Sequence, residues 1–99
     1  MLFLILCADR QDASELRQKN RLRHVEYWQA LGNRVKLGGP FLKEAKPDGA
    51  AKGSMLVVEA ESEAEARRLA DNDPFTIEKV FAEIRVEPFR ATLGEWPPR

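Results

Sequence analysis

The feature that most constrains the fold is a continuous apolar run at residues 2–8, which ends at Asp9 and Arg10. A strand with one face in water alternates apolar and polar residues, whereas an uninterrupted apolar strand is typical of a sheet centre covered on both faces. The run lacks a basic leader and is far shorter than the roughly 20 residues that cross a bilayer. We therefore interpret it as a buried central strand and not as a membrane segment.

The rest of the chain predicts two helices and three further strands. Residues 14–31 lack Pro and Gly, and Asp12, with Glu15 three places on, is a candidate polar cap, so this is the longest predicted helix. Ser62 and Glu65 have the spacing of a capping box at the start of a second helix. The predicted elements are a strand at 2–8, a helix at 14–31, strands at 34–37 and 54–60, a helix at 62–70, a helical turn within 74–80 and a strand at 81–87.

Three segments between these elements have the composition of turns or loops. Gly38-Gly39-Pro40 is expected to turn the chain after the second strand, and the polar residues 43–53 are expected to form an exposed, mobile connection. Residues 90–99, with Trp96-Pro97-Pro98, are predicted to be a weakly ordered or partner-docked tail. The whole chain, 1–99, is therefore treated as a single domain.

The order strand, helix, strand, strand, helix, strand favours an α+β, ferredoxin-like βαββαβ fold, with a four-stranded antiparallel sheet and both helices on one face. In the third strand, Met55 and Val57 face one way while Leu56 and Val58 face the other. Helices on one side would then leave an apolar sheet face in water. We predict a homodimer packed through its sheet faces.

Composition excludes several classes of partner. The chain has 16 Lys and Arg against 16 Asp and Glu, which leaves no excess positive charge for nucleic acid or anionic lipid. One Cys and one His cannot supply the usual four-ligand zinc site, and a lone Cys favours a cytoplasmic setting. We therefore expect a cytoplasmic protein that binds no nucleic acid, inserts into no membrane and needs no metal or organic cofactor.

His24 is the first candidate for chemistry because its ordinary pKa lies near neutrality. At helical periodicity it falls on one stripe of the long helix. The other members of this stripe are Leu16, Asn20, Tyr27, Trp28 and Leu31. A half-buried histidine with a hydrogen-bonded carbonyl is one explanation, and a general acid or base is the other.

Asp73, Asp9 and Arg21 carry similar pairs of explanations. Asp73 precedes Pro74, which predicts a helix N-cap, yet a carboxylate fixed in this way can also orient an imidazole. Asp9, at the end of the first strand, begins a turn or joins His24 as a further acid. Arg21, one helical turn before His24, binds an anionic substrate or forms a solvated ion pair.

A chain-wide set of motifs resembles the YCII-related family, also called YciI-like. The motifs are Arg21-x-x-His24, Gly39-Pro40, Asp48-Gly49, Gly53-Ser54 and Asp73-Pro74-Phe75, and the resemblance runs from the first strand to Pro88-Phe89. It implies a dimeric α+β barrel similar in fold to muconolactone isomerase, with a His and Asp pair in a pocket. The family includes a dehydrochlorinase that acts on a chlorinated hydroxyquinol.

The resemblance also implies roles for individual residues. It makes His24 the leading catalytic candidate, Asp73 its carboxylate partner and Asp9 a secondary acid. It further implies that substrate contacts come from the motif residues Arg21, Gly39, Pro40, Ser54 and Phe75. The predicted function is an isomerase or lyase, of the dehydrochlorinase type, that moves a proton on a small cyclic or enolisable molecule; the alternative is a noncatalytic ligand-binding or accessory domain with a structural histidine.

Overall fold

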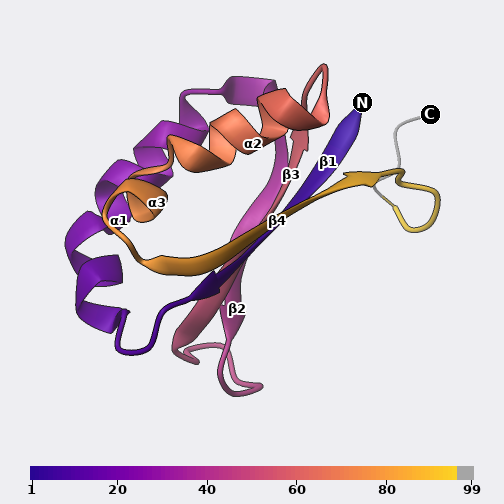
Figure 1. The fold of residues 1–99 in the computed structure, drawn as a ribbon. Helices are drawn as coiled ribbons and strands as arrows, with labels where there is room; N and C mark the ends of the chain where they lie inside the picture. Colours follow the sequence, from indigo (N-terminus) through magenta and orange to yellow (C-terminus); the bar gives the residue numbers. More distant parts are fainter. Residues whose placement is uncertain (96–99) are drawn as a thin grey trace.

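A computed structural model describes residues 1–95, and these form a curved four-stranded antiparallel sheet with its helices on one face (Figure 1). The strand order is β2-β3-β1-β4, which is the predicted ferredoxin-like α+β arrangement. The elements are β1 (Leu2–Asp9), α1 (Ser14–Gln29), the 3-10 turn η1 (Gly32–Arg34), β2 (Val35–Leu42), β3 (Ala51–Glu59), α2 (Glu63–Asp71), α3 (Pro74–Ile77) and β4 (Phe81–Phe89). The tail residues 96–99, including Trp96-Pro97-Pro98, lie outside the described residues.

The apolar run at residues 2–8 lies at the centre of the sheet, as predicted, between β3 and β4. Phe3, Ile5 and Cys7 face the helices and are buried. Their partners Val58 and Leu56 on β3 are buried too, because paired residues of antiparallel strands lie on the same face. Together with Trp28 and with Ala66 and Ala70 of α2, these side chains form the main core.

The other face of the sheet carries no helix in the part of the chain that is described. Leu4 and Leu6 alternate onto this face, next to Val57 and Met55 of β3. On β4 the pattern changes, since Glu87 and Arg85 pair with the same two leucines. This face is therefore apolar over β1 and β3 and charged along β4.

The predicted turn at Gly38-Gly39-Pro40 was wrong, since all three residues lie inside β2. Their partners on β3 are Leu56, Met55 and Ser54. An edge strand can contain proline because the missing N–H can face away from the ladder. β2 is the edge strand, so the strand continues through the glycines to Leu42 and the connection begins only afterwards.

The predicted polar cap at Asp12 was also wrong. The N-cap of α1 is Ala13, which makes no side-chain cap hydrogen bond. Asp12 instead adopts a left-handed conformation with φ of 58°, which aspartate tolerates better than most residues. It reverses the chain between β1 and α1, and a residue in that conformation is not in the extended geometry of a cap.

The second helix begins where the sequence predicts. Ser62 is the N-cap of α2, and its hydroxyl accepts a hydrogen bond from the Glu65 amide at 3.1 Å.

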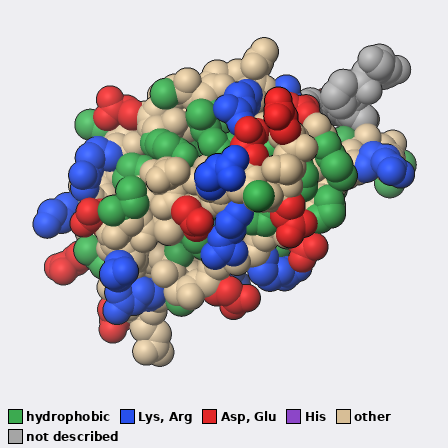
Figure 2. All heavy atoms as spheres, turned by 45° about the horizontal axis from the view of Figure 1, so that its top comes forward, with side chains coloured by type: hydrophobic (Ala, Val, Ile, Leu, Met, Phe, Trp, Pro, Cys, Tyr) green, Lys and Arg blue, Asp and Glu red, His purple; other side chains and the backbone are tan. Residues whose placement is uncertain are grey.

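On the face of the molecule drawn in Figure 2, acidic and basic side chains are interspersed. Among the described residues, no helix has the length and apolar character needed to span a bilayer.

Candidate active site

A short helix fixes one carboxylate in the interior of the protein. Asp73 is the N-cap of α3, and its Oδ1 accepts the Phe75 amide at 2.9 Å. Pro74 occupies the first turn, where a proline costs nothing because its missing N–H would have no helical partner. The residue is only 1% exposed, so the cap also buries a carboxylate that needs further donors.

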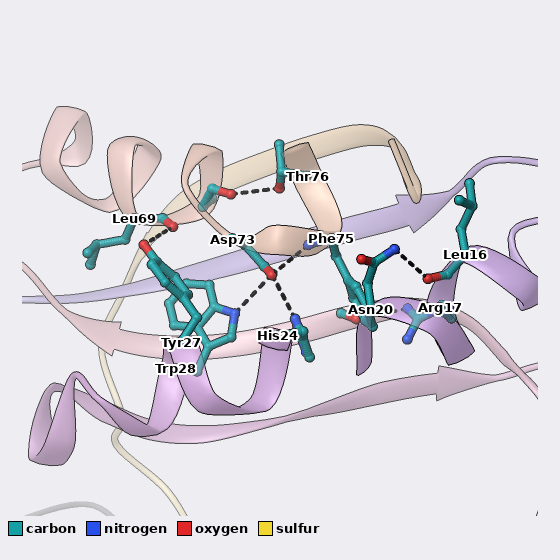
Figure 3. A network of polar contacts seen from close by, with 12 residues as sticks. Leu16, Arg17, Asn20, His24, Tyr27, Trp28, Leu69, Asp73, Phe75 and Thr76 are labelled. Carbon is teal, nitrogen blue, oxygen red and sulfur yellow. Dashed lines mark hydrogen bonds and ion pairs between the residues drawn. The ribbon is translucent and has the colours of Figure 1, made fainter. Parts of the chain in front are cut away.

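Two side chains of α1 provide those donors, although they lie more than 40 residues earlier in the chain. His24 Nδ1 lies 2.8 Å from Asp73 Oδ1 and 3.0 Å from Oδ2. The indole N–H of Trp28 donates to Oδ2 at 2.9 Å, so the two residues reach the same carboxylate from successive turns of the helix (Figure 3). Because a carboxylate accepts, Nδ1 carries the proton, and Nε2 is the imidazole nitrogen with a free lone pair.

The ring of Phe75 contacts two polar side chains of α1. The His24 imidazole stacks on it with a centroid distance of 3.9 Å and an interplanar angle of 8°. The Arg17 guanidinium carbon lies 5.0 Å from the same centroid, so Phe75 lies between His24 and Arg17 (Figure 3). Phe75 itself is 1% exposed, so its ring is held by packing and restricts the positions of both side chains that contact it.

Arg17 links the end of β1 to β3. Its Nε donates to Asp9 Oδ2 at 2.6 Å, and its Nη2 donates to Asp9 Oδ1 at 2.9 Å. Nη2 also donates to Ser54 Oγ at 2.9 Å. Bidentate pairing of this kind fixes the plane of the guanidinium group.

A pocket of about 780 Å³ lies between α1 and the strands β2 and β3. Its size is in the range of small-molecule sites. It is lined by Ser14, Arg17, Gln18, Arg21, His24, Val25, Trp28, Gln29, Gly32, Val35, Gly38, Gly39, Pro40, Ala50, Ala51, Ser54, Met55, Leu56 and Phe75. The charged or titratable groups therefore lie on α1, and the wall from β2 is made of small or apolar residues.

The structure brings most of the predicted site residues to this pocket. The lining includes His24, Arg21, Gly39, Pro40, Ser54 and Phe75. Asp73 lies behind His24 and does not line the pocket, while Asp9 contacts Arg17 and not His24.

Sequence reasoning missed Arg17 and Trp28 as parts of the site. A helical pattern could have indicated both residues, because positions 17, 21, 24 and 28 are spaced by four, three and four residues and therefore share one face of α1. Trp28 had been placed on the apolar stripe, but its indole N–H had no predicted acceptor. Arg17 had no signal of its own until Asp9 and Ser54 were brought beside it.

A buried thiol and a partly buried phenol near the site have raised pKa values. Burial raises the pKa of the Cys7 thiol to about 12, and the negative charges of Asp73 and Asp9 act in the same direction. Burial also raises the pKa of Tyr27, again with a contribution from Asp73. Both groups are thus held protonated, and Cys7 is unsuited to act as a thiolate nucleophile.

Residues 1–90 match the family model described as YCII-related domain. The chain belongs to the YCII-related family. Within this family it is 33% identical over 95 residues to Protein YciI of Escherichia coli O6:H1 and, to the same extent, to Protein YciI of Shigella flexneri. Each alignment covers 91% of this chain and 97% of the relative.

Solved structures extend the comparison to an enzyme. The chain is similar to 5-chloro-2-hydroxyhydroquinone dehydrochlorinase, TftG, from Burkholderia phenoliruptrix in complex with 2,5-dihydroxybenzoquinone, with 35% identity and a TM-score of 0.87. That match covers 93% of this chain and 96% of TftG. Protein Atu4242 from Agrobacterium tumefaciens, at 16% identity and a TM-score of 0.53 over 99% of this chain, shares the fold.

Proposed function

We propose that this protein is a small-molecule enzyme of the isomerase or lyase type, in which His24 transfers a proton on a cyclic or enolisable substrate. The observation that carries the proposal is the Asp73 carboxylate bound to His24 Nδ1 at 2.8 Å. This contact selects the neutral tautomer whose Nε2 can accept a proton. It also stabilises the imidazolium formed after that transfer, because the positive charge then faces a carboxylate.

The surroundings of the pair support the same chemistry. The His24 side chain is 16% exposed and lines the pocket, so a ligand can reach it, whereas Asp73 is shielded behind it. Stacking on Phe75 and the hydrogen bond to Asp73 restrict both the tilt and the rotation of the imidazole. A base held in this way loses little freedom when a substrate binds.

The substrate class comes from the similarity to TftG. That relative acts on 5-chloro-2-hydroxyhydroquinone and has been solved with 2,5-dihydroxybenzoquinone, so small oxygenated rings are the first compounds to test. Removal of hydrogen chloride and isomerisation can both begin with proton abstraction next to a carbonyl carbon. Among the described residues that line the pocket, His24 is the base for that step, and the product depends on whether chloride leaves or the proton returns to another carbon.

The test is a proton-exchange assay in deuterium oxide with cyclic ketones, hydroxyquinols and lactones, followed by NMR. Chloride release from 5-chloro-2-hydroxyhydroquinone is measured in parallel. We expect His24→Gln and Asp73→Asn to slow turnover by about 10²- to 10⁴-fold, the usual contribution of a positioned general base. Asp71→Asn is the matched control, because Asp71 lies on the exposed side of α2 in an ion pair with Arg67 and should not alter the rate.

Two results would reject the enzyme hypothesis. One is turnover that is unchanged in His24→Gln. The other is saturable binding in the pocket by wild-type protein without exchange or chloride release for any compound, which would support the noncatalytic ligand-binding alternative.

We also propose that the protein works as a homodimer packed through its open sheet faces. Leu4, Leu6 and Met55 lie on that face, and an apolar surface of this kind favours association. The opposite charges of Arg85 and Glu87 on β4 supply polar partners at the margin of the apolar area. A second copy presents the same apolar and charged groups, so it fits this surface.

Analytical ultracentrifugation tests the dimer. Wild-type protein is expected to sediment as a dimer, and Leu4→Glu as a monomer that retains its far-UV circular dichroism. Leu22→Glu is the control, because Leu22 is 70% exposed on α1. A monomeric wild-type protein, or a dimer that tolerates Leu4→Glu, would rule out this interface.

A further inference from the structure

Arg17 is a partly buried pocket residue that the proposed proton transfer leaves without a role. Its side chain is 14% exposed and lies between the Asp9 carboxylate and the Phe75 ring. Asp9 holds it through two hydrogen bonds, from Nε and from Nη2. Asp9 is thereby committed to Arg17, so it is a positioning residue and not a second acid beside His24.

The hydrogen bonds of Arg17 leave donors free at the pocket. Among residues 1–95, Nε and Nη2 have acceptors, while Nη1 has two N–H groups without one. Ser54 Oγ already accepts from Nη2, and a hydroxyl that accepts still has its own O–H to donate. Both residues line the pocket, which therefore contains a guanidinium edge and a hydroxyl with unused donors side by side.

These donors have a defined position relative to His24. Residues 17 and 24 are separated by seven positions, which is two helical turns or about 10 Å along the axis. Both side chains contact the Phe75 ring, which fixes the spacing between the base and the donors. The His24 ring and the Arg17 guanidinium lie 3.9 and 5.0 Å from the Phe75 centroid, so they are at most about 9 Å apart and can contact neighbouring atoms of one small ring.

We propose that Arg17 Nη1 and the Ser54 hydroxyl bind an oxygen of the substrate that becomes anionic, so that the pocket selects planar enolisable or phenolic molecules with such an oxygen. The inference rests on the proposed function. When His24 Nε2 removes the proton, the C–H electron pair forms a C=C bond and the carbonyl π pair moves onto oxygen. The oxyanion then lies against Arg17 and Ser54, and the proton stays on the imidazolium, whose Nδ1–H remains bound to Asp73.

The charges of the lining favour an anion. Arg21, one turn after Arg17 on the same face of α1, also lines the pocket. The pocket lining includes neither Asp nor Glu among the described residues. The charge of Arg17 is balanced by Asp9 behind it, so Arg17 supplies oriented donors and Arg21 supplies net positive charge.

Calorimetric titration with two quinones tests the inference. 2,5-Dihydroxybenzoquinone ionises readily, whereas 2,5-dimethoxybenzoquinone has the same ring and cannot. Ser54→Ala and the double variant Asp9→Asn/Arg17→Gln each remove donors, and the double variant leaves no unpaired buried carboxylate. We expect each to weaken binding of the ionised quinone by about 10- to 100-fold, the usual effect of a lost charge-assisted hydrogen bond, and to change the Kd of the dimethoxy compound less than threefold.

Lys19→Gln is the control, because it removes a positive charge from α1 at an exposed residue that does not line the pocket, and it should leave both Kd values unchanged. Equal losses for both quinones, no loss for either, or wild-type protein that does not prefer the ionised quinone would overturn the inference. The proposed function is judged separately, by proton exchange in His24→Gln. If exchange depends on His24 while the Arg17 and Ser54 variants keep the anion preference, the oxygen subsite is wrong and proton transfer stands.

Discussion

The hydrogen bond between Trp28 and Asp73 permits a quantitative test of how the site is built. The test is a double-mutant cycle with Trp28→Phe and Asp73→Asn. An asparagine at this position must keep its oxygen toward the Phe75 amide, which Asp73 Oδ1 accepts at 2.9 Å. Its amide NH₂ then replaces Oδ2 and faces the Trp28 indole N–H, so that two donors oppose each other in a buried place.

The expected energies follow from these contacts. A hydrogen bond to a charged group contributes about 1.5–3 kcal/mol, and a buried donor left without an acceptor costs about 1–3 kcal/mol. We expect Asp73→Asn to lower the free energy of unfolding by about 3 kcal/mol, since it loses the bond and strands the indole. In the Trp28→Phe background no indole N–H remains, so the same substitution should cost less by roughly 1.5–3 kcal/mol.

The assay is urea unfolding followed by far-UV circular dichroism, because Trp28→Phe removes a fluorophore. Chain concentration is held constant, since association would make apparent stability depend on it. Asp71→Asn in both backgrounds is the control and should be additive. If Trp28→Phe and Asp73→Asn are also additive within about 0.5 kcal/mol, the indole and the carboxylate are not coupled and the reasoning is refuted.

Three further sets of substitutions test other parts of the structure. The pKa of Cys7 is raised from 9.0 to about 12, so above pH 9 the folded protein holds a proton that the unfolded chain loses. The free energy of unfolding should therefore fall as pH rises above about 9. Denaturation measured from pH 8 to 10.5 should show this slope in wild type and a flatter slope in Cys7→Ala. Gly53→Ala should cost at least about 2 kcal/mol, because the new Cβ would lie 2.4 Å from the Cys7 carbonyl oxygen, whereas Gly39→Ala meets nothing within 4 Å and should be nearly neutral in urea unfolding. Ser62→Ala should lower stability by about 1 kcal/mol through loss of the cap to the Glu65 amide, and Ser62→Thr should restore most of it.

Local sequence signals predicted the strands and helices because each depends on a short pattern. The apolar run at 2–8, the alternation at 81–87 and the Ser62 cap all describe contacts within a few residues or one face of one element. Gly38-Gly39-Pro40 misled because its composition is that of a turn, and only the position of β2 at the sheet edge makes an extended proline acceptable. Asp12 misled because a cap and a left-handed turn favour the same residue type.

The site could be predicted only in part. His24 and Asp73 each carried a signal, from a helical stripe and from an Asp-Pro pair, but their distance depends on how α3 packs against α1. Arg17 could not be recognised as a pocket residue in this way, since its partners Asp9 and Ser54 come from two strands that meet only in the folded sheet. Contacts between segments that are far apart in the sequence cannot be predicted from the local pattern of any one segment.

The division of the pocket between α1 and β2 has a consequence for how relatives can diverge. His24 and Asp73 are anchored to helices, while the facing wall comes from the edge strand β2, which pairs only with β3 in the described sheet. Side chains of different size can therefore be exchanged along that wall with little effect on the helices that hold the imidazole. Ligand preference can therefore differ among relatives through β2 while the His24–Asp73 pair keeps its geometry.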